Sequence, residues 1–169
     1  GEQRPRIGNA IFGQYGRDFT SRDGESFMVV ALTARHFRDL TELTGRTEAV
    51  AALGQALNAD FADEGHRYQH REALNELFAE WFRSHTAAQV SAALTASSVL
   101  WERYQSFAEV ADSPRVRSNP LFTLLEQERI GSYLSPGLPM SVDGTHIPAA
   151  PAPGLGDDNL TVPAEWLAE

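Results

Sequence analysis

The sequence predicts an α+β fold in which roughly four or five helices cover a small antiparallel sheet. Near the N-terminus an Asp-Gly turn separates two apolar or β-branched runs, and this pattern is a strong signal of a β-hairpin. Apolar residues then recur at helical spacing, and further short strand patterns follow the helical part. Strands at both ends with helices between them favour one antiparallel sheet with the helices grouped on it.

The predicted hairpin covers residues 17–32 and turns at Ser21-Arg22-Asp23-Gly24. Gly24 adopts the positive φ that such a turn requires at no steric cost. The second strand of the hairpin is apolar almost throughout. We therefore expect this strand to lie in the centre of its sheet, with both of its faces covered.

The helices are predicted from capping residues and from apolar periodicity. Thr33 is placed to cap a first helix that ends at Gly45, and Thr47 is placed to cap a second helix. The clearest helix covers residues 64–84, where apolar side chains recur at i, i+3, i+4, i+7 and i+8. This stripe, which we expect to lie in the core, consists of Leu74, Leu77, Phe78, Trp81 and Phe82.

Two capping boxes and three strand-like runs mark the remaining elements. The boxes begin at Thr86 and at Ser106, and each should start a helix. A short buried strand is predicted at residues 99–101, and two further strands at residues 121–125 and 130–134. After the last of these strands the chain is crowded with proline and glycine, which predicts an extended segment.

The composition excludes several classes of function. The formal net charge is −9, so no basic surface is expected to follow a nucleic-acid backbone. All 14 basic residues are arginine, which excludes chemistry that depends on lysine. Cysteine is absent, so disulfides and thiolate metal sites are not available. No apolar run is long enough to cross a membrane and no signal peptide is recognisable, so we expect a cytoplasmic protein without membrane contact.

Several segments, in one order along the chain, resemble the family III CoA-transferases of the CaiB/BaiF type. The first are GQYGRDF at residues 13–19 and RDGESFMVVALT at residues 22–33, followed by an amphipathic helix that ends in Thr-Gly. VLWERYQSFAEVADSPRV at residues 99–116, NPLFTLLEQERIGSYLSPGLPM at residues 119–140 and PAPGLGDD at residues 151–158 follow in the family's order. The resemblance covers nearly the whole chain.

This resemblance implies a division of the chain and of the chemistry. Residues 1–135 would form the small domain of such an enzyme, and residues 136–169 would return, extended, to the large domain or pack on a partner chain. Family members form interlocked homodimers. Their catalytic Asp takes the acyl group as a mixed anhydride and lies in the large domain, so this chain alone is expected to be inactive. Coenzyme A would enter as part of the acyl-CoA substrate, with no separate cofactor and no metal.

The resemblance also implies which residues face the substrate. In formyl-CoA transferases a glycine-rich loop closes over the active site. Here the matching substrate-facing loop would hold Gly13, Gln14, Tyr15 and Arg17. The wall of the cleft would hold Thr33, Trp101 and Tyr104. An arginine at such a site would pair with the free carboxylate of a dicarboxylic acyl group. For each of these residues, ordinary packing in the core or on the surface is the alternative.

Within the family, the pattern most resembles members that move CoA between the two carboxyl groups of one unsaturated C5 dicarboxylate. Racemases of the α-methylacyl-CoA type are an alternative. They usually carry Glu where this chain has Thr33, and a hydroxyl cannot replace a carboxylate in proton transfer. Asp158 stands where the family commonly has His, which places any role of that His in doubt.

Two other classes of function are also open. A non-catalytic interaction module would bind a partner through its proline-rich tail. A metal site would use His66 and His70, whose i, i+4 spacing can present two imidazoles to one ion. Because the residues between them do not form the HExxH motif, a hydrated helix face is the simpler interpretation.

Overall fold

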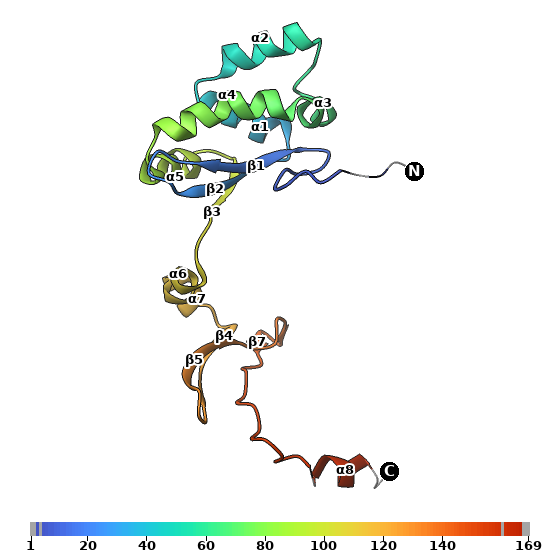
Figure 1. Cartoon of the computed structure of the whole chain (residues 1–169), viewed down its shortest axis with the longest axis vertical. Helices are drawn as coiled ribbons and strands as arrows, with labels where there is room; N and C mark the ends of the chain where they lie inside the picture. The colour runs from blue at the N-terminus through green and yellow to red at the C-terminus, as the bar shows by residue number, and fades with distance from the viewer. Residues whose placement is uncertain (1–2, 4, 160, 167–169) are drawn as a thin grey trace. The chain divides into compact units, whose positions relative to one another are not determined.

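The chain folds as two units, Gly1–Tyr104 and Gln105–Glu169, and the computed structural model describes residues 3, 5–159 and 161–166 (Figure 1). The first unit contains β1 (Tyr15–Thr20), β2 (Ser26–Ala31), α1 (Ala34–Leu43), α2 (Thr47–Leu57), α3 (Glu64–Gln69), α4 (Arg71–Ser84), α5 (Ala87–Thr95) and β3 (Leu100–Arg103). The second contains α6 (Phe107–Asp112), α7 (Pro114–Arg117), β4 (Phe122–Gln127), β5 (Gly131–Pro136), β6 (Ser141–Val142), β7 (Thr145–His146) and α8 (Thr161–Trp166). The predicted α+β fold class is confirmed.

The sheet of the first unit has the antiparallel order β1-β2-β3, so β2 is central as predicted. Burial alternates along β2: Phe27, Val29 and Ala31 are fully buried, whereas the residues between them are half-buried. The expectation that both faces of this strand are covered is therefore wrong within this unit. The helices pack on one face, which gives the two-residue burial period of a half-covered strand.

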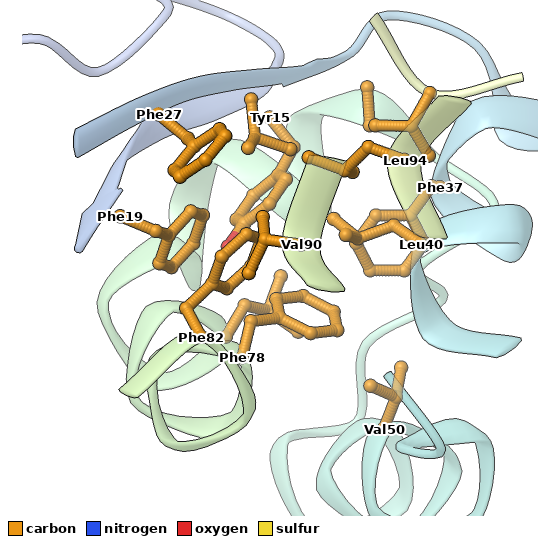
Figure 2. Close-up of a cluster of buried hydrophobic side chains, with 14 of the residues drawn as sticks. Tyr15, Phe19, Phe27, Phe37, Leu40, Val50, Phe78, Phe82, Val90 and Leu94 are labelled. Carbon is orange, nitrogen blue, oxygen red and sulfur yellow. The ribbon is translucent and has the colours of Figure 1, made fainter. Parts of the chain in front are cut away.

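An aromatic core joins the buried face of the sheet to α4, and Figure 2 shows side chains from both elements facing one another. Phe19 stacks on Phe82 with ring centroids 4.4 Å apart, and Tyr15 meets Phe78 edge to face at 5.7 Å. Leu74 is buried beside them, which confirms the predicted apolar stripe of α4. Burial of each such side chain contributes roughly 1.5–3 kcal/mol, so this helix holds the unit together.

Local side-chain chemistry defines most of the helix ends. Thr33 caps α1, and Gly45 ends it with a φ of +65°. The predicted capping boxes at Thr86 and Ser106 both form and start α5 and α6. Thr47, in contrast, is the first residue of α2 and not its cap, so that prediction is wrong by one position.

The helix predicted for residues 64–84 is broken into α3 and α4 at His70, where ψ is +21°. The break leaves the Tyr68 carbonyl near the end of α3, and the Arg71 side chain donates a hydrogen bond to it at 2.8 Å. The sequence offers no glycine or proline at this point, so periodicity alone predicted one continuous helix.

Two carboxylates connect elements of the first unit. Asp23 in the hairpin turn accepts hydrogen bonds from the Ser21 hydroxyl at 2.7 Å and from the Ala87 N–H at the start of α5 at 2.8 Å. Asp39 on α1 accepts two hydrogen bonds from Ser98, one from the hydroxyl at 2.5 Å and one from the N–H at 3.2 Å. Hydrogen bonding from the Ser21 hydroxyl and then from the Ala87 N–H lowers the pKa of Asp23. The Ser98 hydroxyl is the largest cause that lowers the pKa of Asp39.

The later strands do not join the first sheet, which corrects the prediction of one sheet for the whole chain. The strand predicted at residues 99–101 becomes β3, although Leu100 on it is exposed. The strands predicted near residues 121–125 and 130–134 pair with each other as β4 and β5. A short turn joins β4 to β5, so local pairing forms a separate hairpin in the second unit.

Within the second unit, the proline- and glycine-rich segment contacts the β4-β5 hairpin at Gln127 and packs closely on itself at Gly137. The Gln127 amide accepts a hydrogen bond from the Ala152 N–H at 2.8 Å and donates one to the Ala152 carbonyl at 3.1 Å. A Cβ atom on Gly137 would clash with the Ile147 carbonyl, so only glycine fits this close approach. The division into residues 1–135 and 136–169 concerns a complete enzyme and stays a prediction.

We predict that Leu74→Ala on α4 lowers the free energy of unfolding by about 3 kcal/mol or more, because it leaves a cavity in the core. The matched control is Leu57→Ala at the end of α2, where the side chain is 39% exposed and the expected loss is less than about 1 kcal/mol. Urea unfolding followed by far-ultraviolet circular dichroism measures both. Equal losses would show that the α4 stripe does not organise this core.

We also predict that the stability of the chain depends on pH through Asp23. The pKa of Asp23 is lower in the folded state, so its contribution is complete above the unfolded pKa of about 4 and is lost as the pH falls through the folded pKa. Asp23→Asn should therefore flatten the acid limb of stability against pH, and Ser21→Ala should fall between this variant and the unchanged chain. A limb for Asp23→Asn that coincides with that of the unchanged chain would contradict the assignment. Urea titrations from about pH 6 to about pH 2 test it.

Candidate functional site

A hollow of about 340 Å³ lies beside β1, between this edge strand, α4 and the glycine-containing segment before β1. Its lining combines backbone from that segment with charged and amide side chains from the two elements. The lining residues are Ile7, Gly8, Asn9, Ala10, Arg17, Asp18, Glu72 and Asn75. This hollow brings residues of the predicted substrate-facing segment next to polar groups from a helix far away in the sequence.

The segment before β1 folds back on the strand because of its glycines. Gly8 and Gly13 adopt φ values of +62° and +74°, which other residues rarely adopt. The Ile11 N–H then donates a hydrogen bond to the Gly16 carbonyl at 2.9 Å. A Cβ atom on Gly16 would lie 2.7 Å from the Ile11 side chain, so a larger residue would push the segment away.

A chain of polar contacts runs from the core to the hollow. The Tyr15 hydroxyl donates a hydrogen bond to Asn75 Oδ1 at 3.0 Å, and the two residues are 1% and 3% exposed. Asn75 Nδ2 donates to Glu72 Oε2 at 3.3 Å. The same Glu72 oxygen lies 3.8 Å from Arg17 Nη1. A series of contacts thus links Arg17 to a buried phenol through two intervening side chains, of which Glu72 is 75% exposed.

Burial raises the pKa of the Tyr15 phenol well above its usual range, and the charges of Arg17 and Glu72 act on it in opposite directions. Tyr15 is therefore a neutral hydroxyl at physiological pH. It serves as a hydrogen-bond donor to Asn75, and it does not supply a phenolate to the hollow.

The Arg17 guanidinium is hydrogen-bonded through Nε, whereas its Nη1 forms only a loose ion pair. Its Nε donates a hydrogen bond to the Asp18 carbonyl at 3.2 Å, and its side chain is 38% exposed. The 3.8 Å separation from Glu72 exceeds hydrogen-bond distance. Ion pairs elsewhere among the described residues that are within hydrogen-bond distance include Arg46–Glu80 at 2.8 Å, Arg103–Glu25 at 2.6 Å and Arg117–Asp112 at 2.6 Å.

The predicted loop residues thus have different environments. Arg17 lines the hollow, whereas the Tyr15 ring lies in the core and is not presented to a ligand, because it packs against Phe37 and Phe78. The Gln14 side-chain oxygen is buried and makes no hydrogen bond with the described residues. A role for Gly13 and Gln14 in contacting a substrate stays a prediction.

The predicted wall residues do not converge on this hollow. Thr33 caps α1 with its hydroxyl, and Trp101 packs against the aromatic core. Tyr104 is half-exposed, and its hydroxyl accepts a hydrogen bond from Asn9 Nδ2 at 3.4 Å, so it contacts the segment that lines the hollow. Roles of these residues as a cleft wall stay a prediction.

Glu72 and Asn75 were not predicted from the sequence. The sequence contains a signal for Asn75, since this polar residue stands three positions before Phe78 and seven before Phe82, on the apolar stripe itself. A polar side chain at a core position needs a buried partner, and that partner is Tyr15. No comparable signal marks Glu72, which is one of several carboxylates on the exposed side of α4.

A larger hollow of about 760 Å³ lies between α1, α2 and the loop that precedes α3. Its lining is mainly apolar, and none of the residues predicted to face a substrate contributes to it. We therefore place the candidate site at the smaller hollow beside β1, where the charged and buried polar groups meet.

The described part of the chain contains no group of three or more His, Asp or Glu side chains that could hold a metal ion. His66 Nδ1 accepts a hydrogen bond from the Asp60 N–H at 3.0 Å, and His70 lies at the helix break. The metal hypothesis for this pair gains no support. Among the described residues, no helix is both long and apolar enough to cross a membrane.

Comparisons with known proteins agree on one family. The sequence model of the family described as "CoA-transferase family III" matches residues 1–159. The chain is 39% identical over 167 residues to 2-methylfumaryl-CoA isomerase of Chloroflexus aurantiacus, a match that covers 97% of this chain and 41% of that protein. The chain thus spans about two fifths of the length of this curated relative.

Solved structures show the same fold at lower sequence identity. A mutant of Rv3272 from Mycobacterium tuberculosis matches 89% of this chain and 40% of its own, with a TM-score of 0.66 and 18% identity. A CAIB/BAIF family protein from Brucella suis matches 97% of this chain and 41% of its own, with a TM-score of 0.63 and 20% identity.

We predict that the Tyr15–Asn75 hydrogen bond couples the two residues energetically. Tyr15→Phe and Asn75→Leu each leave a buried polar group unpaired and should each cost about 1–3 kcal/mol. The double variant should cost less than the sum, because neither polar partner remains. Urea unfolding of the four chains gives the coupling energy.

The matched control for this double-mutant cycle of Tyr15 and Asn75 is Tyr68→Phe. The Tyr68 hydroxyl makes no hydrogen bond with the described residues, so its loss should change the stability by no more than about 0.5 kcal/mol. Additive losses for Tyr15→Phe and Asn75→Leu would contradict the coupling.

Proposed function

This chain belongs to CoA-transferase family III, and from that membership we propose that it is the C-terminal part of an enzyme that moves coenzyme A between the carboxyl groups of a short dicarboxylic acyl-CoA. The observation that carries the proposal is the 39% identity to 2-methylfumaryl-CoA isomerase over nearly the whole chain. In the corresponding reaction, CoA would leave one carboxyl group of an unsaturated C5 dicarboxylate and join the other.

The chemistry would be divided between this chain and a larger part of the enzyme. A carboxylate nucleophile attacks the thioester carbonyl, releases the CoA thiolate and forms a mixed anhydride. The CoA thiolate then attacks the enzyme-side carbonyl of this anhydride, which forms an enzyme–CoA thioester and releases the substrate as its dicarboxylate. The other carboxylate of the substrate attacks that thioester, expels the CoA thiolate and forms a second mixed anhydride. Attack of the thiolate on the substrate carbonyl of this anhydride forms the new substrate thioester and frees the nucleophilic carboxylate. We expect this nucleophilic Asp outside the present chain. The hollow beside β1 would supply one wall of the site, and coenzyme A would enter only with the substrate.

The second unit supports the proposal that this part packs on other protein. An isolated two-stranded hairpin is marginally stable in water, and in the described part of the chain β4 and β5 pair only with each other. Its exposed apolar side chains include Leu124 and Ile130, and Leu155 is exposed further along the chain. We expect the large domain or the partner chain of a homodimer to cover them.

The racemase alternative receives less support from the site. A racemase would need a carboxylate where this chain has Thr33. The Thr33 hydroxyl accepts a hydrogen bond from the His36 N–H at 3.1 Å, so it serves as a helix cap. No specific observation favours a non-catalytic interaction module.

We predict that the complete polypeptide interconverts the two CoA thioesters of 2-methylfumarate without consuming a second acid, whereas residues 1–169 alone do not, because the nucleophile is missing. Each isomer is supplied separately, and liquid chromatography with mass spectrometry follows the appearance of the other. The control is the same polypeptide with 2-methylbut-2-enoyl-CoA, which has no second carboxyl group. Conversion by residues 1–169 alone would contradict the division of labour, and no conversion by the complete polypeptide would contradict the proposed reaction.

A further inference from the structure

We propose that Arg17 binds the free carboxylate of the acyl group, and that Glu72 and Asn75 are the residues that position its guanidinium. This inference rests on the proposed function, since it names the part of the dicarboxylic substrate that this wall of the site recognises. It assigns a role to two residues of α4 that the sequence did not single out.

The substrate's chemistry requires a cation at the site. Whichever carboxyl group carries CoA, the other is an anion, and an anion enclosed by protein is costly unless it is paired and hydrogen-bonded. A guanidinium suits this task because its planar fork matches the two oxygens of a carboxylate. Among the residues that line the hollow beside β1, Arg17 is the one that carries this group.

The contacts of Arg17 leave its outer donors available. A guanidinium carries five N–H donors, and Nε uses its own on the Asp18 carbonyl. The remaining donors, on Nη1 and Nη2, make no hydrogen bond with the described residues, since Glu72 at 3.8 Å is too distant. The group is therefore anchored to the strand at its inner end while its outer end faces an open hollow.

Glu72 orients this outer end without occupying it. Asn75 Nδ2 holds Glu72 Oε2 at 3.3 Å, and Arg71 Nε lies 3.5 Å from Glu72 Oε1. The carboxylate is thus restrained from two sides and attracts Arg17 from a distance at which the ion pair is weak. A guanidinium can face one carboxylate with one edge and a second carboxylate with another, so the substrate need not displace Glu72.

The restraint begins in the core. Tyr15 donates to Asn75 Oδ1, so the amide must turn its Nδ2 donors toward Glu72. Because Asn75 is buried and Tyr15 is fully enclosed, neither side chain can rotate without leaving a polar group unpaired. Contacts of Asn75 and Glu72 thus connect the core to the guanidinium at the edge of the hollow.

The test compares two ligands that differ only at the free carboxylate. The complete enzyme is titrated calorimetrically with 2-methylfumaryl-CoA and with (E)-2-methylbut-2-enoyl-CoA, in which a methyl group replaces that carboxylate. We expect the unchanged enzyme to prefer the first by about 10- to 100-fold, the range given by hydrogen bonds to a charged group. Arg17→Gln should abolish this preference and leave the affinity for the methyl analogue unchanged.

The control for this substitution is Arg38→Gln. Arg38 on α1 forms a comparably loose ion pair with Glu42, at 3.9 Å, but does not line the hollow. Arg38→Gln should therefore leave the preference for 2-methylfumaryl-CoA unchanged. Arg17→Lys serves as a second variant, because it keeps the charge and cannot donate a bidentate pair; it should retain only part of the preference.

Glu72→Gln tests the positioning role. This variant keeps an acceptor for Asn75 but removes the charge that orients Arg17, so the preference for 2-methylfumaryl-CoA should fall several-fold while the methyl analogue binds as before. Glu42→Gln, which removes the charge from the other loose pair, is its control. A structural defect in Glu72→Gln would instead weaken both ligands equally.

The outcomes separate this inference from the function on which it rests. If the unchanged enzyme interconverts the two thioesters but Arg17→Gln and Arg17→Lys weaken both ligands equally, or neither, the inference is overturned and the function stands. The same holds if Arg38→Gln abolishes the preference as Arg17→Gln does. If the unchanged enzyme performs no conversion, the proposed function fails, and a carboxylate preference lost in Arg17→Gln would still support the anion site.

Discussion

The hydrogen bond from the Tyr15 phenol to Asn75 is the contact on which the rest of the first unit depends. A tyrosine packed among Phe37 and Phe78 needs a partner for its hydroxyl, and an unpaired one would cost about 1–3 kcal/mol. The partner is an amide on the apolar stripe of α4, so this hydrogen bond joins β1 to α4 within the core. The amide's remaining donors then face Glu72, and the packing of the core continues into the polar edge of the hollow.

At the outer edge of β1, contacts to two backbone carbonyls both protect the strand from further pairing and form part of the candidate site. An edge strand exposes backbone carbonyls that other chains can pair with. Here the Gly16 carbonyl accepts from the Ile11 N–H, and the Asp18 carbonyl accepts from Arg17 Nε. These contacts protect the edge and also bring the glycine-containing segment and a guanidinium to the hollow. The contacts that prevent β1 from pairing with another chain are thus the same contacts that form the candidate site.

Local chemistry explains which elements were predictable. The hairpin turn at Gly24 and the caps at Thr33 and Thr86 involve neighbours within a few residues, so they could be predicted from the sequence. The break at His70 has no such signal, and a long-range contact decides the environment of Tyr15, whose partner lies 60 residues away. The candidate site was therefore predicted at Arg17 but not at Glu72 or Asn75. The strands β4 and β5 were likewise predicted from the sequence, whereas their separation from the first sheet was not.

The central claim is that the core orients Arg17 toward the free carboxylate of the substrate. A crystal structure of the complete enzyme with 2-methylfumaryl-CoA bound tests it most directly. The account predicts that Nη1 and Nη2 of Arg17 lie within about 3 Å of the carboxylate oxygens, with the Tyr15–Asn75 hydrogen bond unchanged. A structure in which another residue binds the carboxylate, while Arg17 closes on Glu72, would contradict it.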